Sequence, residues 1–358
     1  MDPEAVYAAL SEEMNDVLIG NDDVVEGITV SLLTRGHILL EGVPGVAKTT
    51  IANAFARATG LDFTRVQMTP DLLPADITGT HVYREGTGEF QLQRGPIFTN
   101  LLVADEINRA TPKTQSALLE GMQERTVTIE GDTLPLPSPF MVIATQNPIE
   151  MDGTYELPEA QRDRFQCKLV VELPSDEDEL RLIDRFNEMP DLTPEDLSQV
   201  VTLDDILDAR EVVRTVHVAE SVKTYIQSLV SASRDHSDIT HGGSPRATLA
   251  LLHTAKARAA VHGRDYVIPD DVKALTVPVL RHRLVLSTEA ELSDRSTVEV
   301  VDDLLDAVTP PNGANEEDID DSDADFESDA DFDSDRSNVD STDPDSVDAG
   351  RPDPSNDD

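Results

Sequence analysis

A glycine-containing turn followed by a lysine and two threonines is the clearest chemical motif of the sequence. Residues 41–50 read EGVPGVAKTT. They fit the phosphate-binding pattern G-x-x-x-x-G-K-S/T at Gly42, Lys48 and Thr49, but Ala47 stands where the second glycine is expected. In such a loop, backbone N–H groups and the lysine contact phosphate oxygens, and the hydroxyl binds Mg²⁺. The motif therefore predicts a nucleotide phosphate site with a magnesium ion.

The context of this loop supports the prediction. An apolar stretch, HILLEG at 37–42, predicts a strand before it, and TTIANAFARATG predicts a helix that begins at Lys48 and ends at Gly60. We expect Ala47 to have a negative φ, because it directly precedes this helix, so that its methyl group is tolerated. The residues expected to surround the nucleotide phosphates are Gly42, Val43, Pro44, Gly45, Val46, Ala47, Lys48, Thr49 and Thr50.

Two further apolar stretches end in polar side chains. NLLVADE at 100–106 ends in Asp105 and Glu106, and FMVIATQN at 140–147 ends in Asn147. Ligands of open α/β sheets bind at the carboxyl ends of parallel strands, so these side chains are expected near the loop. Asp105, with Thr49, is the expected magnesium site, and Glu106 is expected to polarise the attacking water.

The elements that must position these residues predict an α/β fold with a parallel sheet. The strands are continuously apolar, which is typical of parallel strands covered on both faces. Helices are expected between them, one of them starting with Thr111 as a cap and Pro112 at its first position. Helices with acidic faces are expected over residues 1–35. Together these elements predict an α/β nucleotide-binding domain over residues 1–173.

The rest of the chain changes character twice. Residues 174–308 predict a small all-α domain, whose first helix starts at Ser175 with Asp178 three residues later. Further helices are expected at 202–215, 219–234, 245–262 and 269–280. Residues 309–358 are mostly Asp, Ser, Asn and Pro and cannot bury a core, so a disordered acidic tail is expected.

The charge of the chain is strongly negative. The formal net charge is −43, of which the 46 residues from Gly313 onward contribute −17, so that residues 1–312 carry −26. An acidic surface attracts a basic partner. Alternatively, it is an adaptation to molar salt, which screens self-repulsion within a few ångströms. The bases comprise only six Lys beside 22 Arg, and this scarcity of Lys favours the second interpretation and a halophilic, archaeal source.

Other function classes find little support in the sequence. The single cysteine, Cys167, excludes an internal disulfide, and no histidines have metal-ligand spacing. No signal peptide or 18-residue apolar run is present, so a cytoplasmic protein without a membrane span is expected. Aromatic residues make up 4% of the chain, without Trp and without a basic stripe, so nucleic-acid binding is not expected.

Over about residues 4–308 the chain resembles the MoxR-type AAA+ ATPases, of the clade with an insertion in helix 2. That family commonly has Ala before the lysine of its phosphate loop. The resemblance rests on that loop and on these segments: QMTPDLLPADITG (67–79), GPIFTNLLVADEINRATPKTQSALLEGMQE (95–124), ATQNP (144–148), DGTYELPEAQRDRF (152–165) and SPRA (244–247).

The resemblance implies further roles. Asn147 would be the sensor 1 residue and Arg246, on the helical lid, the sensor 2 residue. Arg164 resembles the arginine finger that a neighbouring subunit inserts, although Arg162 occupies a position where the family usually has an apolar residue. Arg281 and Arg283 are expected to form surface ion pairs.

Two hairpins are expected, one at 80–95 with GTG at the turn and one at 125–139 with Gly131-Asp132 at the turn. Both resemble the pore-facing insertions of the family.

The resemblance implies magnesium-dependent ATP hydrolysis by a ring of six subunits, which remodels or matures client protein complexes. ATP would lie between the α/β domain and the lid of one subunit. A partner with a von Willebrand A-type domain is a frequent family companion. Two alternatives stay open: a motor subunit like that of magnesium chelatase, and a scaffold that assembles on ATP with little turnover.

Overall fold

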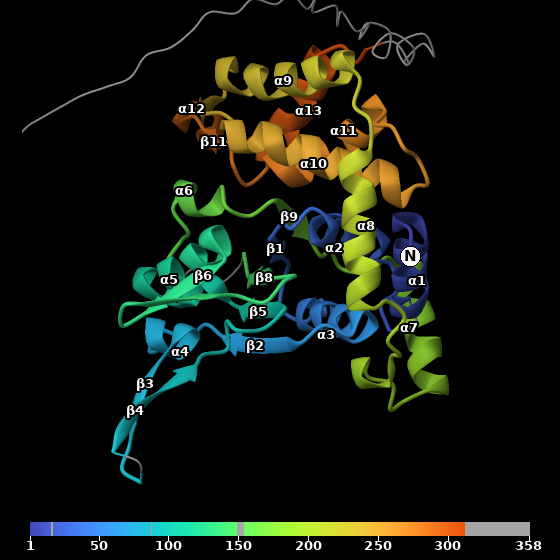
Figure 1. Ribbon diagram of the computed structural model, residues 1–358. Coiled ribbons are helices and arrows are strands. Elements are labelled where there is room, and N and C mark those ends of the chain that lie inside the picture. Colours follow the sequence, from blue (N-terminus) through green and yellow to red (C-terminus); the bar gives the residue numbers. More distant parts are fainter. Residues whose placement is uncertain (16, 87, 149–153, 312–358) are drawn as a thin grey trace, which may run out of the picture. The chain divides into compact units, whose positions relative to one another are not determined.

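The computed structural model describes residues 1–15, 17–86, 88–148 and 154–311. At its centre lies a five-stranded sheet with the order β2-β5-β8-β1-β9, in which every pairing is parallel (Figure 1). Its strands are β1 (Ile38–Glu41), β2 (Phe63–Gln67), β5 (Leu101–Asp105), β8 (Met141–Gln146) and β9 (Cys167–Val170). The parallel α/β sheet is therefore confirmed, whereas the expected tail from 312 onward lies outside the described residues.

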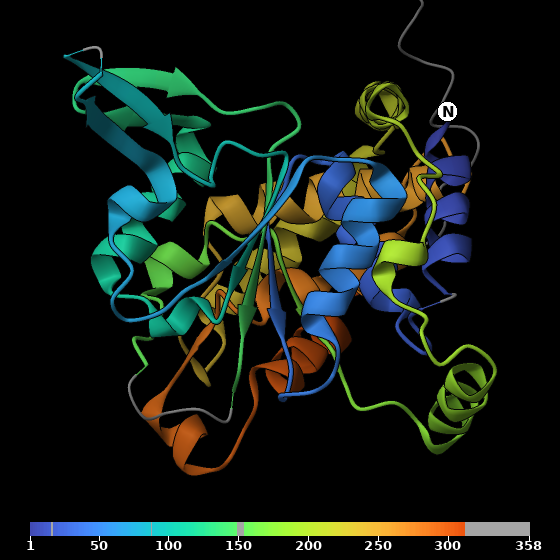
Figure 2. The ribbon, with the colours of Figure 1, turned by 90° about the horizontal axis from the view of Figure 1, so that it is seen from below.

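Helices cover both faces of this sheet (Figure 2). Side chains alternate between the faces, so that Ile38 and Leu40 of β1 enter one apolar cluster and Leu39 enters another. The first cluster includes residues of α1 (Pro3–Met14), α2 (Asp22–Leu33) and α3 (Lys48–Thr59). The second includes residues of α4 (Pro74–Thr78) and α5 (Pro112–Glu124). Burial on both faces explains why the central strands are continuously apolar.

The prediction from sequence missed strand β2. This strand lies at the edge of the sheet, pairs only with β5 among the described strands, and its residues are exposed or half-buried. Its sequence, FTRVQ, therefore lacks the apolar run that identified the central strands. Gly60 ends α3 in the left-handed conformation (φ 62°), as predicted. Thr111 occupies the N-cap position of α5, but its side chain forms no capping hydrogen bond, which corrects the prediction.

The remainder of the described chain is mainly helical, as expected. Ser175 caps the first of its helices by accepting a hydrogen bond from the backbone N–H of Asp178. Its elements are α7 (Asp176–Glu188), α8 (Leu203–Thr215), α9 (Glu220–Asp235), α10 (Pro245–Val261), α11 (Pro269–Leu280), α12 (Thr288–Leu292), α13 (Thr297–Ala307) and the short strands β10 (Ile239–His241) and β11 (Val285–Leu286). Short helical turns lie at α6 (Glu159–Arg162), η1 (Ile107–Arg109) and η2 (Pro194–Asp196).

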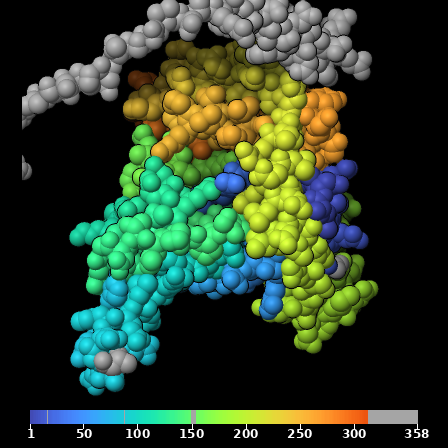
Figure 3. Space-filling model, viewed as in Figure 1, coloured from blue at the N-terminus to red at the C-terminus, as the bar shows by residue number. Residues whose placement is uncertain are grey.

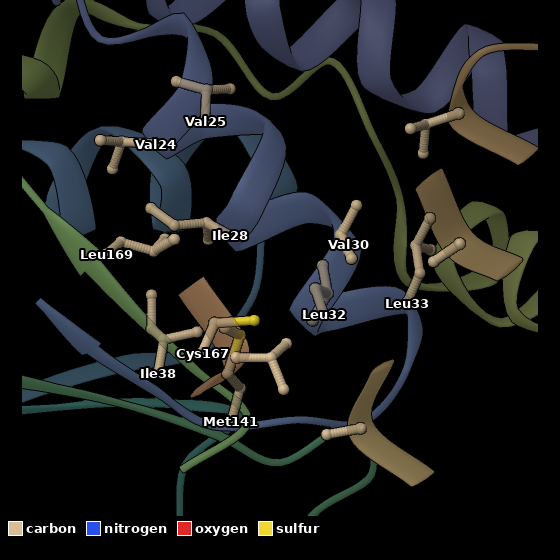
Figure 4. Packing of buried hydrophobic residues seen from close by; sticks show 14 of the residues in the cluster. Val24, Val25, Ile28, Val30, Leu32, Leu33, Ile38, Met141, Cys167 and Leu169 are labelled. Atoms are coloured by element: carbon tan, nitrogen blue, oxygen red, sulfur yellow. The ribbon is translucent and has the colours of Figure 1, made fainter. Parts of the chain in front are cut away.

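Helix α2 differs from the expectation of acidic-faced helices at the N-terminus. Nine of its 12 residues are buried, among them Val24, Ile28 and Leu32. The helix lies between the sheet and the helices α1, α8 and α10, so apolar groups surround most of it. Figure 4 shows Ile28 and Leu169 side by side, with Cys167 below them. Cys167 is fully buried, and its burial raises the pKa of the thiol to about 11, as expected for a small core residue.

Both predicted hairpins are present. The first consists of β3 (Gly79–Arg84) and β4 (Glu89–Arg94), and the second of β6 (Thr126–Ile129) and β7 (Asp132–Pro135). In the second hairpin the turn residues are Glu130 and Gly131, both with positive φ, and not Gly131 and Asp132. Asp132 instead pairs with Ile129, since a two-residue turn of this kind needs positive φ at both of its central positions.

The buried ring of His37 predicts acid sensitivity. Its Nδ1 accepts a hydrogen bond from the backbone N–H of Val142 (2.9 Å), and its Nε2 lies 3.1 Å from the carbonyl of Met122. Protonation of Nδ1 would destroy the first bond, and burial lowers the pKa from 6.5 to about 4. The unfolded chain therefore takes up this proton first. The contribution to stability is complete above pH 6.5 and is lost as the pH falls toward 4, by about 3 kcal/mol.

Denaturant unfolding of His37→Gln at pH 7.5 and pH 5 tests this expectation. The variant should be less stable than the wild type at pH 7.5, and the difference should shrink at pH 5. His241→Gln, at an exposed position of β10, is the control and should follow the wild type at both values. A difference between the His37→Gln variant and the wild type that is the same at both pH values would contradict the proposed titration.

Candidate functional site

The phosphate loop connects β1 to α3 at the carboxyl edge of the sheet. Gly42 passes so close to the end of β9 that a Cβ there would lie 2.6 Å from the carbonyl oxygen of Val171. Gly45 has φ 91° in open space, and Pro44, Gly45 and Ala47 are exposed. The loop is therefore tightly held at its base by the glycine and open to solvent at its tip.

Ala47 does not have the negative φ that the sequence suggested. Its φ is 61°, in the left-handed region, immediately before the first residue of α3. The reason is the sharp reversal of the loop, which has to turn into the helix within one residue. A left-handed alanine costs about 1–2 kcal/mol relative to its relaxed state, so the loop tolerates the alanine with strain that glycine would avoid.

Lys48 and Thr49 start helix α3 and lie beside the loop. The Lys48 ammonium group donates to the carbonyl oxygens of Gly42 (2.5 Å) and Val43 (2.9 Å). The Thr49 hydroxyl lies 3.3 Å from Oδ2 of Asp105. Three of the predicted residues thus meet at one edge of the sheet, and the lysine closes the loop on itself.

The oxygen atoms of Thr49 and Asp105 suit a magnesium ion. Mg²⁺ prefers hard oxygen ligands, and one carboxylate with one hydroxyl beside a phosphate loop is such a set. Asp105 is 6% exposed and terminates β5. Burial acts to raise its pKa, but hydrogen bonds from Thr145 and Arg65 outweigh burial and lower it. The carboxylate is therefore ionised at neutral pH and available as a ligand. Among the described residues, no cluster of three or more His, Cys, Asp or Glu that could hold a metal ion is present.

Four polar residues that the sequence analysis did not single out hold the two carboxylates. The Thr145 hydroxyl donates to Oδ1 of Asp105 and accepts from the backbone N–H of Glu106 (2.9 Å). The Arg65 guanidinium donates to Oδ2 of Asp105, through Nε at 3.0 Å and also through Nη2. Oε2 of Glu106 accepts from Nε2 of Gln67 (2.7 Å) and from Nη1 of Arg109 (2.8 Å).

These contacts join the two carboxylates into one network. Nη2 of Arg65 also donates to Oε1 of Gln67 (3.2 Å), and Gln67 stands opposite Asp105 in the pairing of β2 with β5. If strand β2 had been recognised in the sequence, Arg65 and Gln67 could have been placed beside Asp105. The carboxyl ends of β2 and β5 lie on the same side of the sheet. Asn147 follows β8 at this edge and is 6% exposed.

Arg65 is expected to compete with magnesium for Asp105. Arg65→Ala should lower the Mg²⁺ concentration needed for half-maximal nucleotide binding by about two- to fivefold, since an ion pair with one exposed partner is worth up to about 1 kcal/mol. The magnesium dependence of ATP binding, followed by fluorescence of a labelled nucleotide, measures this. Arg57→Ala, at an exposed position of α3, should leave the dependence unchanged. A higher magnesium requirement in Arg65→Ala would show instead that Arg65 orients the carboxylate for the ion.

Arg164 and Arg246 lie on the other side of the sheet from the phosphate loop, at the amino-terminal ends of its strands. Arg164 lies in the segment that leads into β9, which begins at Cys167, and its Nη1 donates to the carbonyl oxygen of Leu119 (2.7 Å). Arg246 is the second residue of α10, and its Nη1 lies 3.8 Å from Oδ2 of Asp163. The four-residue strands β1 and β9 separate this edge from the phosphate loop by about 13 Å at 3.3 Å per residue.

The placement of Arg246 corrects two expectations. The lid does not bring Arg246 to the phosphate loop of its own chain, so the structure does not form a nucleotide site between the two. The reason is Arg283, expected on the surface but in fact buried, whose guanidinium donates to Asp163 (2.9 Å) and to the carbonyl oxygens of Phe165 (2.6 Å) and Gln166 (3.0 Å). These bonds hold the end of α11 at the amino edge of the sheet.

The surroundings of Arg162 and Arg164 differ. Arg164 lines a cavity of about 310 Å³ that Arg246 also lines. Arg162 lies near the buried His282, whose pKa is lowered well below 6.5 mainly by burial and also by the charges of Arg283, Lys168 and Arg162. Arg164 is therefore the one of the two that shares a cavity with Arg246.

Comparisons with known proteins agree with the fold. A family model described as the ATPase family associated with various cellular activities (AAA) matches residues 37–167, and a model of the AAA lid domain matches residues 231–304. A crystal structure of a candidate ATPase from Cytophaga hutchinsonii superimposes with a TM-score of 0.79 at 40% identity, over 87% of this chain and 96% of that one. The AAA fold followed by a helical lid is thereby confirmed. No helix in the described part of the chain is long and apolar enough to cross a membrane.

Sequence relatives identify the family. The chain is 47% identical over 308 residues to Chaperone MoxR1 of Mycobacterium tuberculosis, covering 84% of this chain and 81% of that one. It is 44% identical over 300 residues to YeaC of Bacillus subtilis, covering 84% and 93%. A magnesium-chelatase subunit ChlI homolog of Methanocaldococcus jannaschii is more distant, with 30% identity over 193 residues, which is 52% of this chain and 50% of that one. The chain therefore belongs to the MoxR family of AAA ATPases.

Proposed function

We propose that this protein hydrolyses ATP in a site built from the phosphate loop of one subunit and the arginines of the next. The observation that carries the proposal is the convergence of Lys48, Thr49, Asp105 and Glu106 at one edge of the sheet, with Arg164 at the other. The arginines at this end of the strands, Arg65 and Arg109, bind the carboxylates of Asp105 and Glu106, so the arginine that acts on the transferred phosphoryl group is proposed to come from a neighbouring copy. The boundaries proposed for the nucleotide-binding domain and the lid stay at 1–173 and 174–308.

Each residue has a definite task in this proposal. Residues 42–50 hold the phosphates through backbone N–H groups and the start of α3, and Lys48 leaves its loop carbonyls for the outer phosphates. Thr49 and Asp105 would hold Mg²⁺, which neutralises charge on the phosphates. Glu106 takes the proton of the attacking water, and Asn147 orients that water. The backbone N–H of Glu106 donates to the Thr145 hydroxyl, which fixes the position of the Glu106 backbone.

Arg164 and Arg246 act on the neighbour's nucleotide in the same proposal. Both line one cavity, and both belong to the edge that faces away from their own loop. Their guanidinium groups would stabilise the charge that develops on the transferred phosphoryl group. A closed ring, of six subunits by analogy with the family, gives every loop a partner edge.

The work done with this energy is proposed to be the remodelling or maturation of protein complexes. The name of the mycobacterial relative, a chaperone, supports this assignment. The β3–β4 hairpin carries Tyr83 and Phe90, 53% and 69% exposed, with their ring centroids 5.3 Å apart. An exposed aromatic pair on a hairpin suits contact with a client chain. A client with a von Willebrand A-type domain, a halophilic source and a cytoplasmic location remain parts of the proposal.

A motor subunit of the magnesium-chelatase type is the less favoured alternative, because the relatives of that type match only about half of this chain. The scaffold alternative, with ATP binding but little turnover, is also less favoured. The carboxylate of Glu106, the proposed base, is present and is held in place by Gln67 and Arg109.

Steady-state ATP hydrolysis in molar KCl with Mg²⁺, over a range of protein concentrations, tests the proposal. The rate per subunit should rise with concentration, because each site needs a second copy. Lys48→Ala should abolish nucleotide binding and turnover together. An equal mixture of Lys48→Ala and Arg164→Ala should recover part of the activity, since one variant supplies the loop and the other the arginine. A concentration-independent rate with an inert mixture would disprove the shared site.

A further inference from the structure

A pocket lined by cationic side chains lies apart from the phosphate loop. It has a volume of about 570 Å³ and lies between the ends of α2 and α5 and the helices α8 and α10. Figure 3 shows a hollow between the α5 segment and α8, with blue atoms of the N-terminal part of the chain visible in it. We call it the basic pocket, because five basic residues in its lining have no acidic partner in the part of the chain that the structure describes: Arg35, Arg125, Arg210, His253 and Lys256.

The charge of this pocket is opposite to that of the chain as a whole. The sequence has 71 acidic and 28 basic residues, yet no Asp or Glu of the described ranges lines the pocket. Within the described ranges, none of its five residues forms an ion pair with a carboxylate, and the sixth base of the lining, Arg214, pairs outside it with Glu211 (2.8 Å). Burial and the charge of Lys256 lower the pKa of His253, so the charge of the pocket comes from Arg35, Arg125, Arg210 and Lys256, which are available to a bound anion.

Arg210 shows that the pocket is a built feature and not a chance gathering of surface side chains. Only 4% of Arg210 is exposed, and its Nε and Nη2 donate to the carbonyl oxygen of Leu32 at 3.0 and 2.6 Å. No hydrogen bond joins its Nη1 to another residue of the described ranges. Burial, with the charges of Arg35 and Arg125, lowers the pKa of Arg210 to about 10.

Burial and neighbouring positive charges also lower the pKa values of two other groups of the pocket. Burial and the charge of Arg35 lower the pKa of Arg125, and burial and Arg214 lower that of Lys256. Placing like charges close together costs free energy, which a bound anion would return. The fold keeps Lys256 in this position, since its ammonium group donates to the carbonyl oxygen of Arg214 (2.6 Å).

We propose that the basic pocket binds the phosphate groups of a nucleotide or polyphosphate, at a site separate from the phosphate loop. Planar guanidinium groups bind phosphate oxygens in pairs, and the pocket presents three of them with an ammonium group. Its volume accommodates a chain of phosphates, and direct contacts of this kind persist where salt screens longer-range attraction.

The phosphates have two possible sources. Thr34, Arg35 and His253 line both the basic pocket and the neighbouring cavity that contains Arg164 and Arg246. The pocket is therefore continuous with the edge proposed to face another subunit's nucleotide. Either that nucleotide or a free anion supplies the phosphate groups, and only the first source depends on the proposed function.

The test uses the full chain with Lys48→Ala, so that the phosphate loop does not contribute. Inorganic tripolyphosphate is titrated into it by calorimetry in molar KCl. One anion per chain is expected, and adding Arg125→Gln with Lys256→Gln should weaken binding at least about tenfold, since the pair removes two charge-assisted hydrogen bonds to the anion. The control pair Lys223→Gln with Lys273→Gln removes equal charge from exposed lysines paired with Glu220 and Asp270 and should bind as before.

A second measurement separates the sources. With Lys48 intact, association of subunits in ATP is followed by sedimentation for the same two pairs of substitutions. Tripolyphosphate binding to the Lys48→Ala chain identifies a free anion. A pocket-specific loss of ATP-dependent association, without tripolyphosphate binding, identifies the neighbour's nucleotide. The proposal is overturned if both pairs behave alike in both measurements. It is also overturned if the pocket pair weakens association equally without nucleotide, because an acidic protein surface would then be the partner.

Discussion

Glu106→Gln is expected to bind ATP as the wild type does and to hydrolyse it at least about 100-fold more slowly. Glutamine has the shape of glutamate but cannot take the proton of the attacking water, and a general base contributes about 10²–10⁴ in rate. The substitution changes no backbone feature: Glu106 has φ 56°, set by the turn from β5 into η1, and its N–H bond to Thr145 does not involve the carboxylate.

Two readouts are needed for this variant. Nucleotide affinity, measured by displacement of a fluorescent ATP analogue, should stay within about threefold of the wild type, because the side chain lies beyond the loop that holds the phosphates. Turnover is measured by phosphate release at saturating ATP. Glu177→Gln, at an exposed position of α7, serves as the matched control and should keep full activity. Full turnover in Glu106→Gln would assign the base to another residue and remove the mechanism proposed here.

The sequence predicted the carboxyl edge of the sheet better than the network around it. Lys48, Thr49, Asp105, Glu106 and Asn147 were found because each follows or starts a strongly patterned element. The residues that hydrogen-bond to the two carboxylates were not found, because the sequence pattern around them is weak.

Arg65 and Gln67 stand on a half-exposed edge strand without an apolar run, and Thr145 is a polar residue within a buried strand. Such residues become recognisable only when the pairing of β2, β5 and β8 is known. The register of distant strands depends on the whole core and cannot be read from one segment.

Sequence patterns could not predict the position of the lid, for a related reason. Helical periodicity predicted the helices of residues 202–280 nearly to the residue, yet it contains no information on which edge of the sheet they cover. That depends on a few buried polar contacts, such as the bond from His282 to the carbonyl of Phe165 (3.0 Å). Arg283 was expected at the surface because arginine is rarely buried unless it is paired, and its partner Asp163 lies 120 residues away in the chain.

Arg283→Ala is expected to destabilise the protein by about 3–5 kcal/mol, the typical cost of removing one partner of a buried ion pair. The Arg283 side chain is 3% exposed, and the 19% exposed Asp163 would lose its closest cation. The carbonyl oxygens of Phe165, Gln166 and Val279 would each lose the hydrogen bond from Arg283, although Phe165 would keep its bond to His282, and water would have to enter the contact between α11 and the segment before β9.

Urea unfolding at fixed KCl concentration measures this loss. Arg281→Ala is the matched control, since Arg281 is two residues away and forms no ion pair within the described part of the chain. It should cost less than about 1 kcal/mol. Arg283→Lys should recover only part of the stability, because an ammonium group cannot reach Asp163 and three carbonyls with a planar fork. If Arg283→Ala unfolded at the same urea concentration as Arg281→Ala, the lid would be held by its apolar contacts alone. Arg164 and Arg246 would then keep their positions without Arg283, and their contribution to a neighbouring site would not depend on it.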